Sequence, residues 1–466
     1  MSNFWYEYHW GKVPFVEYRT DLNTLQTTLS HALASRGSLP TLAAPMRRLS
    51  LAFCGCGSRA RTYAAIAAGM SDQFALVAAA DPVPERVAVI RSHAPAGADF
   101  RSFASAEAMF AGGKPADVVV VGTQDAQHRD HAIRAMELGC DLLLEKPIAH
   151  RLDDTLAVRD AARRLGRRVV VCHVLRYTPF YAQVQALLRS GAIGEIVSAN
   201  FIEGVQPWHQ AHSFVRGHWS VEAKSSPMIL AKSCHDMDLL AWLIDRPCET
   251  IASFGSRTYF TAARAPAGAP ARCTDGCPVA ATCLYDAHRY ARPEGRRWLA
   301  MVHDRAKEAS EAEVFAWLRT SPWGRCVYRC DNDVVDHQVI AAQFAGQVTA
   351  TFTMTAFDEG RHLEIFGTEG VLRGGAFVKK QLGCDLVVTR HGWDQPAEKI
   401  VVETPAVGYA GHGGGDFGLM STLHADLTCP DPAGMRTSLE VSLQSHLMAF
   451  AAEESRRSGR TVTLAV

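Results

Sequence analysis

The stretch Leu51 to Arg61, LAFCGCGSRAR, decides the fold of the first part of the chain. A short apolar run stops at Gly55 and Gly57, which one residue separates, and polar residues follow. Such a glycine pair is a weak motif by itself, because it is frequent by chance. Its meaning depends on the segments around it.

Four short apolar runs surround the glycines. They are RRLSLAF before the pair, FALVAAAD ending at Asp81, ADVVVVGT ending at Thr123 and CDLLLEKP ending at Pro147. Amphipathic stretches such as AQHRDHAIRAMELG separate them. Wholly apolar runs that alternate with helical stretches predict a parallel sheet covered on both faces. Such a sheet binds ligands where its strands end, and all four runs end in polar or glycine residues.

In that setting the glycines predict a dinucleotide site. Gly55 permits the tight turn, and Gly57 lets a pyrophosphate approach the helix N-terminus. Asp81 ends the second predicted strand, where a carboxylate binds the adenosine ribose hydroxyls and repels a 2′-phosphate. This favours NAD over NADP, although Arg59 and Arg86 lie near enough to oppose that preference.

The segment LLLEKP presents one amine at the edge of the predicted sheet. Pro147 stops the strand and restricts the backbone, so Lys146 is held in one orientation. A lysine beside a nicotinamide can hydrogen-bond a substrate hydroxyl and stabilise the alkoxide that forms. We therefore predict Lys146 as a catalytic residue. The residues expected to contact the cofactor are Gly55, Gly57, Ser58, Arg59, Asp81, Thr123, His128, Glu145 and Lys146.

FCGCGSRA, GTQDAQHRDHAIRAMELGCDLLLEKPIA and SCHDMDLLAWL resemble the Gfo/Idh/MocA oxidoreductases, from about Arg47 to the C-terminus. The resemblance implies an α/β chain with an N-terminal Rossmann domain and a C-terminal α+β domain. The second domain is expected to contain a large, mainly antiparallel sheet with the substrate site and the oligomer interface. The resemblance also implies NAD(P)-dependent chemistry on a ring hydroxyl of a sugar or cyclitol, by a homodimer or homotetramer.

We expect three parts in the chain. Residues 1–45 form an extension that is either a poorly ordered tail or an oligomer arm. Residues 46–168 form the Rossmann domain. Residues 169–466 form the substrate domain, with a cysteine-containing insertion at about 257–330 whose helical stretch 284–321 lids the substrate cleft.

The segment ILAKSCHDMDLLAWLID predicts the other half of the catalytic site. By the resemblance, His235 matches a histidine of the inositol dehydrogenase branch, and an imidazole is a natural acceptor for a hydroxyl proton. That branch has an aspartate four residues earlier, where this chain has Ala231 followed by Lys232. We expect Lys232 to bind substrate oxygens or a negative group, and Asp236 or Asp238 to orient His235.

The stretch SANFIEGVQPWHQAHSFVRGHW is rich in histidine and tryptophan. Aromatic faces stack on sugar C–H groups and imidazoles bind hydroxyls, so both sugar contact and ordinary loop packing stay open. A metal at His209 and His212 lacks a third ligand. The predicted substrate residues are Arg176, Tyr177, Trp208, His209, His212, Arg216, Lys232 and Asp238.

RCTDGCPVAATC and RCVYRC bring several cysteines into the insertion. Thiolates at such spacing can bind zinc, yet the spacing is not C-x2-C, so structural zinc and free thiols both stay open. The C-x3-C-x5-C spacing argues against an iron–sulfur cluster. The candidate ligands are Cys273, Cys277, Cys283 and Cys330.

Alternation in QVIAAQFAGQVTATFTMTAF and RHLEIFGTEGVLRGG predicts meander strands of the second domain. A glycine-rich segment, GYAGHGGGDFGLM, follows them. His412 and Asp416 are near enough to reach the cleft, but capping explains Asp416 more simply. We therefore expect Asp416 to cap the helix that it begins.

Composition excludes several classes of partner. The 466 residues carry equal numbers of acidic and basic side chains, which removes any global electrostatic attraction to nucleic acid or an anionic membrane. No apolar run approaches the length that spans a bilayer. Thirteen cysteines without a secretory pattern predict reduced thiols and a cytoplasmic protein.

The leading hypothesis is an NAD-dependent dehydrogenase of a sugar, glycoside or cyclitol. The alternative is an NAD-dependent glycosidase that works by transient oxidation, elimination, water addition and re-reduction, on an anionic glycoside such as a uronate. A third class, a non-catalytic dinucleotide-binding regulator, is disfavoured by the combination of Lys146 and His235.

Overall fold

A computed structural model describes residues 47–404, 411–431 and 434–464. The predicted N-terminal extension, residues 1–45, lies outside the described residues.

The first sheet contains six parallel strands in the order β3-β2-β1-β4-β5-β6. This order is that of dinucleotide-binding domains, with the switch point between β1 and β4, and it confirms the Rossmann prediction. The strands are β1 (Leu49–Cys54), β2 (Phe74–Ala80), β3 (Arg101–Phe103), β4 (Val118–Val121), β5 (Asp141–Leu144) and β6 (Val169–Val171). The helices between them are α2 (Ser58–Ala68), α3 (Pro84–Ser92), α4 (Ala106–Ala111), the turn η1 (Asp125–Gln127), α5 (His128–Glu137) and α6 (Leu152–Leu165).

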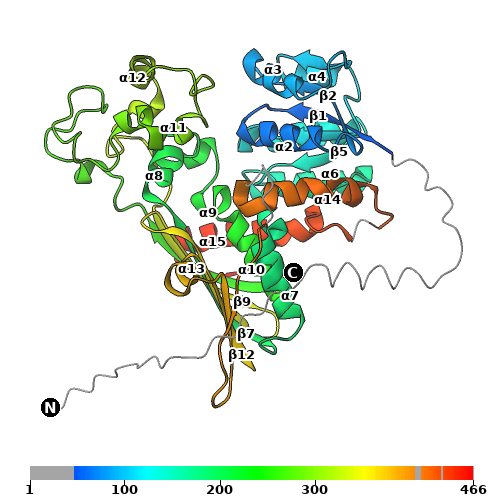
Figure 1. Cartoon of the computed structure of the whole chain (residues 1–466), viewed down its shortest axis with the longest axis vertical. Coiled ribbons are helices and arrows are strands. Elements are labelled where there is room, and N and C mark those ends of the chain that lie inside the picture. Colours follow the sequence, from blue (N-terminus) through cyan, green and yellow to red (C-terminus); the bar gives the residue numbers. More distant parts are fainter. Residues whose placement is uncertain (1–46, 405–410, 432–433, 465–466) are drawn as a thin grey trace, which may run out of the picture.

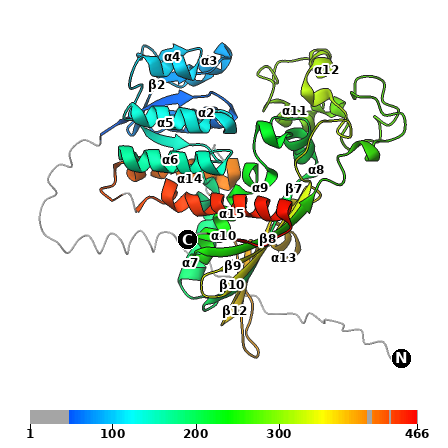
Figure 2. The same ribbon diagram turned by 180° about the vertical axis from the view of Figure 1, so that it is seen from behind.

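A helix from near the C-terminus completes this layer. Leu419 and Leu423 of α14 (Gly415–Thr428) lie in one buried cluster with Leu51 and Phe53 of β1. Figures 1 and 2 show α14 in orange alongside the blue and cyan elements. The core of the Rossmann domain therefore includes a segment that the sequence analysis assigned to the second domain.

The second sheet contains nine strands in the order β14-β13-β12-β11-β7-β10-β9-β8-β15. Only β7 and β10 run parallel within it, so the prediction of a mainly antiparallel sheet is confirmed. The strands are β7 (Ile196–Val205), β8 (Cys248–Ser256), β9 (His337–Phe344), β10 (Val348–Thr355), β11 (Glu359–Gly367), β12 (Gly370–Gly375), β13 (Leu386–Arg390), β14 (Glu398–Ile400) and β15 (Val462–Thr463).

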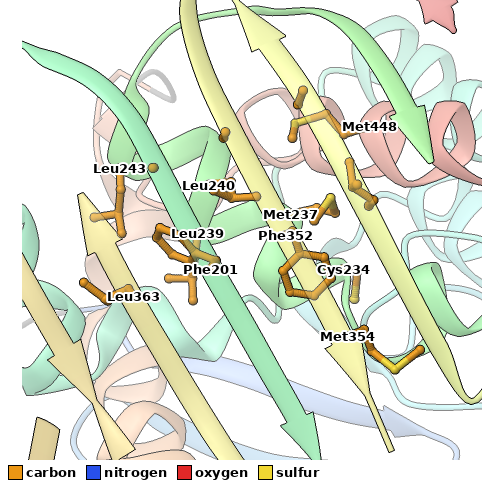
Figure 3. Close-up of a cluster of buried hydrophobic side chains, with 14 of the residues drawn as sticks. Phe201, Cys234, Met237, Leu239, Leu240, Leu243, Phe352, Met354, Leu363 and Met448 are labelled. Carbon is orange, nitrogen blue, oxygen red and sulfur yellow. The ribbon is translucent and has the colours of Figure 1, made fainter. Parts of the chain in front are cut away.

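Helices cover one face of this sheet because its strands alternate apolar and polar side chains. In β10 the apolar residues Phe352 and Met354 are buried, whereas the threonines that alternate with them are more exposed. Figure 3 shows side chains of α10, Met237 and Leu240 among them, facing the sheet. The covering helices are α7 (Pro179–Arg189), α10 (Cys234–Ile244) and α15 (Leu439–Ser458).

The insertion between β8 and β9 has its own small cores. It contains η5 (Ala262–Arg264), η6 (Ala287–Ala291), α11 (Pro293–Leu299), α12 (Glu311–Thr320) and η7 (Pro322–Gly324). Figure 1 shows α11 and α12 standing across from the Rossmann helices. Asp304 of the insertion pairs with Arg86 at 3.1 Å and with Arg61 at 3.4 Å, so ion pairs connect the two bodies.

The remaining elements are short. They are η2 (Val174–Tyr177), α8 (Pro207–His209), the π-helical turn η3 (Gln210–Val215), η4 (Glu222–Lys224), α9 (Met228–Ala231), α13 (Ala376–Leu382) and η8 (Gly411–Gly414). Among the described residues, no helix combines the length and apolar character that crossing a bilayer requires.

Candidate active site

The glycine turn after β1 leaves room for a bound group at the start of α2. Gly55 has φ +84°, and a methyl group there would lie 2.7 Å from the carbonyl oxygen of Gly122. Gly57 precedes α2, and a methyl group there would meet no heavy atom within 4 Å. Ser58, the first residue of the helix, is exposed. This open helix N-terminus fits a pyrophosphate.

Asp81 follows β2 and is buried beside the same turn. Its carboxylate accepts hydrogen bonds from the backbone N–H of Cys56, at 2.8 Å, and of Val83, at 2.9 Å. Each oxygen keeps a lone pair for another donor, since a carboxylate can accept about four hydrogen bonds. Asp81 therefore holds the turn in shape, and its contact with a ribose stays a prediction.

Two other predicted cofactor residues brace the segment after β5. The His128 ring bonds the carbonyl oxygen of Pro147 through Nδ1, at 2.7 Å, and that of Thr123 through Nε2, at 3.1 Å. The Thr123 hydroxyl bonds Nδ1 of His131 at 3.0 Å. His128 is buried, so the geometry gives it a role in holding the Lys146–Pro147 segment rather than a contact with ligand.

Lys146 connects the Rossmann domain to the second domain. Its Nζ donates a hydrogen bond to the carbonyl oxygen of Ala231 at 2.7 Å, just before α10. The ammonium lies near enough to His235 to lower the pKa of that imidazole. The structure thus brings together the two side chains predicted to be catalytic, although they are far apart in sequence.

His235 is a buried imidazole, 6% exposed, whose Nδ1 has no hydrogen-bond partner among the described residues. Its ring lies 5.9 Å from that of His173 and 6.2 Å from that of His412, measured between centroids. Burial, and then the charges of Lys146 and neighbouring groups, hold the pKa of His235 well below its usual value. The imidazole is therefore neutral.

Arg59 occupies the centre of a buried charge network. Its guanidinium donates to Glu145 Oε1 at 2.9 Å and to both oxygens of Asp416, at 2.6 and 2.9 Å. Burial opposes ionisation of Glu145, but Arg59 and Lys146 outweigh it and lower the pKa of Glu145. Arg59 and Glu145 thus position the groups of this network, and their predicted contact with the cofactor stays a prediction.

Asp416 does not cap α14, which corrects that prediction. Gly414 is the N-cap, and no side-chain cap hydrogen bond forms there. Burial would raise the pKa of Asp416, but hydrogen bonds from His412 and Arg59 reverse this and hold it below its usual value. The glycine-rich sequence GHGGGD was the signal that His412 and Asp416 could reach the cleft. Of the two explanations considered for Asp416, reaching the cleft or capping the helix, capping is wrong.

Lys232 belongs to a chain of ion pairs. Its Nζ lies 3.1 Å from Glu203, and Arg361 bridges Glu203, at 3.0 Å, and Asp236, at 2.7 Å. Burial lowers the pKa of Lys232 although Glu203 opposes the shift. Burial, and then the charge of Lys232, also lower the pKa of His209, whose ring lies 5.1 Å from that of Trp298.

Arg176 and Asp238 do not line the site. They form a fully buried bidentate ion pair, at 2.6 and 2.7 Å, that ties α10 to η2. The Tyr177 hydroxyl bonds Thr437 at 2.8 Å beneath α14. This geometry does not support the prediction that these three residues contact substrate, and it gives them a packing role.

Three more predicted substrate residues face the insertion. Nδ1 of His212 bonds the Tyr290 hydroxyl at 2.6 Å, and the Trp208 ring lies 5.2 Å from that of Tyr290. The Arg216 guanidinium donates to the backbone carbonyls of Tyr285 and Arg325, at 2.6 and 2.7 Å. These contacts hold the insertion on η3. Among these loop residues, it is His209 whose pKa the charges of Lys232 and Lys146 lower.

The zinc prediction is not supported. All thirteen cysteines are free, and among the described residues no group of three or more His, Cys, Asp or Glu side chains is arranged to hold a metal. Cys273 lies 3.6 Å from the Arg216 guanidinium, and Cys330 bonds the carbonyl oxygen of Cys326. Burial raises the pKa of Cys273, Cys283 and Cys330 in the metal-free chain.

Two family models match the chain. Residues 49–173 match the Gfo/Idh/MocA oxidoreductase family, NAD-binding Rossmann fold, and residues 181–299 match a Gfo/Idh/MocA C-terminal domain. Together these matches run through both domains of the fold.

Individual relatives are also named as oxidoreductases or dehydrogenases. The putative oxidoreductase YteT of Bacillus subtilis is 25% identical over 338 residues, which cover 70% of this chain and 77% of that protein. Inositol 2-dehydrogenase 2 of Saccharopolyspora erythraea is 28% identical over 142 residues, 30% of this chain and 39% of that protein. A crystal structure of an oxidoreductase from Agrobacterium radiobacter in complex with NAD+, L-tartaric acid and magnesium superposes with a TM-score of 0.62. The superposition covers 90% of this chain and 98% of that chain, at 16% sequence identity, so the likeness concerns the fold alone.

Proposed function

We propose that this chain, which belongs to the Gfo/Idh/MocA oxidoreductase family, oxidises a ring hydroxyl of a sugar, glycoside or cyclitol by hydride transfer to NAD. The hydrogen bond from Lys146 to Ala231 carries the proposal. It joins the carboxyl edge of the parallel sheet to the segment before α10, so that the charge of one ammonium acts on His235.

The chain's own residues supply binding and charge stabilisation. Gly55, Gly57 and Asp81 would hold the dinucleotide, whose oxidised nicotinamide accepts the hydride when bound. Lys146 donates a hydrogen bond to the reacting hydroxyl and stabilises the negative charge that develops on its oxygen. Neutral His235 accepts a hydrogen bond from the same substrate.

His209 and Lys232 are the remaining candidates for substrate contacts. Lys232 is paired with Glu203, and the charges of Lys232 and Lys146 act on His209. The proton of the reacting hydroxyl passes to an imidazole of the site.

NAD is proposed over NADP because of the charges around the adenosine end. The Asp81 carboxylate repels a 2′-phosphate. Arg86 is already paired with Asp304, so it is less available to such a phosphate.

Net oxidation is proposed because no contact in the described site favours the redox-neutral glycosidase. The relative from Saccharopolyspora erythraea is named a dehydrogenase, which also supports net oxidation.

The open face of the second sheet supports a homodimer or homotetramer. Phe254, Val339, Thr353 and Ile202 lie opposite one another on neighbouring strands, so their side chains share the exposed face. Phe254 is 68% exposed. A cytoplasmic location, where thiols stay reduced, accords with the thirteen free cysteines.

The test incubates purified protein with NAD and a panel of free sugars, cyclitols and aryl glycosides. Absorbance at about 340 nm and aglycone release are recorded in the same wells. We expect NADH to accumulate with members of one substrate class, and Lys146→Ala to abolish turnover while NADH still binds. Lys379→Ala, on an exposed lysine of α13, is the control and should leave turnover unchanged.

Two results would contradict the proposal. Aglycone release that needs NAD but yields no net NADH would identify a redox glycosidase. Turnover that survives Lys146→Ala would remove Lys146 from the active site.

A further inference from the structure

A histidine outside the predicted catalytic pair has the geometry of a proton acceptor. Nδ1 of His412 lies 3.1 and 3.2 Å from the two carboxylate oxygens of Asp416. The imidazole is 41% exposed while Asp416 is 2% exposed. No described residue bonds Nε2 of His412, so the pairing leaves that nitrogen for another partner.

The backbone at this position is unusual for a histidine. His412 has φ +50° and ψ +40°, in the left-handed region that residues other than glycine rarely adopt. Two glycines follow it at positive φ. The turn therefore holds the His412 side chain in a position that a helix beginning with ordinary backbone angles would not give it.

Charged groups lie close to His412. Asp416 is its ion-pair partner, and Arg59, which bridges Asp416 and Glu145, lies 3.4 Å from its Nδ1. Asp416 is the nearer of the two, and its carboxylate on Nδ1 favours the tautomer that leaves Nε2 as the base and stabilises the imidazolium that forms.

The surroundings of His235 disfavour protonation of its imidazole. Its Nδ1 has no partner among the described residues, and the residue four positions earlier is Ala231 rather than a carboxylate. The groups that influence it are Lys146, His173, His412 and Arg361, whose charged forms all disfavour a second positive charge nearby.

We propose that His412, with Asp416 as its positioning residue, takes the proton of the substrate hydroxyl in the place that the sequence assigns to His235. This assignment rests on the proposed function. The carboxylate that Ala231 lacks is supplied from α14 to a different imidazole, whose ring lies 6.2 Å from that of His235.

The step balances with the groups already named. The substrate C–H bond breaks and its electron pair leaves as hydride to the oxidised nicotinamide. The O–H bond breaks, its proton moves to Nε2 of His412, and the C=O double bond forms. Asp416 stabilises the resulting imidazolium, which then loses the proton to solvent on its exposed side.

A measurement without substrate tests the Asp416–His412 pair. Ligand-free protein is treated with diethyl pyrocarbonate at about pH 8, and carbethoxylation of single histidines is followed by peptide mass spectrometry. Asp416→Asn should slow the reaction of His412 at least about threefold, because the imidazole loses the charge that raises its nucleophilicity. His337 is the matched internal control, since it is 43% exposed and its Nδ1 lies 2.8 Å from buried Asp336.

The rate at His337 should be the same in wild type and Asp416→Asn. An unchanged rate at His412 would overturn the proposal, whether or not a substrate has been found. This separates its failure from a failure of the proposed function.

A kinetic measurement tests the proton transfer with the substrate that the panel identifies. His412→Gln should lower kcat/KM by about 10²- to 10⁴-fold and abolish the acidic limb of its pH profile. The groups facing this imidazole are Asp416 of α14, Arg59 of α2 and His235 of α10, and none of them is altered in this variant.

The control variants are His235→Gln, expected to lose less than about tenfold, and His337→Gln, expected to be unchanged. NADH affinity, measured by fluorescence titration, should change less than about threefold in His412→Gln. The proposal is overturned if His412→Gln keeps the acidic limb, or if His235→Gln alone removes it.

Discussion

Single residues at this site serve two partners at once. Asp81 accepts hydrogen bonds from the Cys56 and Val83 N–H groups while its remaining lone pairs face the cofactor turn. Arg59 binds Glu145 and Asp416 together. A substitution at either position therefore has an effect on the shape of the turn and an effect on ligand binding, and an experiment has to separate them.

Asp81→Ala separates the two effects by comparing cofactors. If the carboxylate binds the ribose, NADH affinity should fall about tenfold and NADPH affinity less than about threefold, since Asp81 also repels the 2′-phosphate. Fluorescence titration measures both constants, with exposed Asp99→Ala as control. Equal losses for the two cofactors would mean that Asp81 only braces the turn.

Among the elements, α14 connects the parts of the site. Its apolar face packs in the Rossmann core with β1, and its first turn carries Asp416 into the Arg59 network. The same helix thus fixes where His412 lies relative to the dinucleotide turn. Removing the packing of α14 should therefore loosen both His412 and the dinucleotide turn.

Leu423→Ala deletes a fully buried side chain of α14. It should lower the free energy of unfolding by about 2–5 kcal/mol, because a cavity remains in the core. Ser421→Ala, on the exposed side of the same helix, should change it by less than about 0.5 kcal/mol. Urea unfolding followed by circular dichroism gives both values. Equal midpoints for the two variants would show that α14 is not part of the core.

Among the described residues, one face of the second sheet is exposed over β8, β9, β10 and β7, beside the place where α13 packs on β11. The row of Phe254, Val339, Thr353 and Ile202 crosses four neighbouring strands. The opposite face of the same strands packs on α10 and α15 (Figure 3). An apolar row of this kind is suited to burial against a second copy of the chain.

Phe254→Asp should convert the oligomer to a monomer, because burying an unpaired carboxylate in the interface is costly. Size-exclusion chromatography with light scattering measures the mass. Val89→Asp, on an exposed valine of α3 in the Rossmann domain, is the control and should leave the mass unchanged. A wild-type chain that is already a monomer, or a Phe254→Asp variant that stays oligomeric, would exclude this face as the interface.

The sequence alone determined the features that depend on local pattern. Apolar runs with glycine at their ends predict parallel strands and a turn at Gly55, and alternation in VTATFTMT predicts a sheet covered on one face. Lys146 was placed at a strand end by Pro147. These features depend on neighbours in the chain, so the pattern of residues is sufficient to predict them.

Only the tertiary structure decided the contacts between distant segments. Arg176 and Asp238 look like site residues in the sequence, yet they neutralise each other in the interior. Asp416 looks like a helix cap, yet it meets Arg59, 357 positions away. The physical reason is that the partner of a buried charge depends on how helices and sheets dock, and no local periodicity encodes that docking.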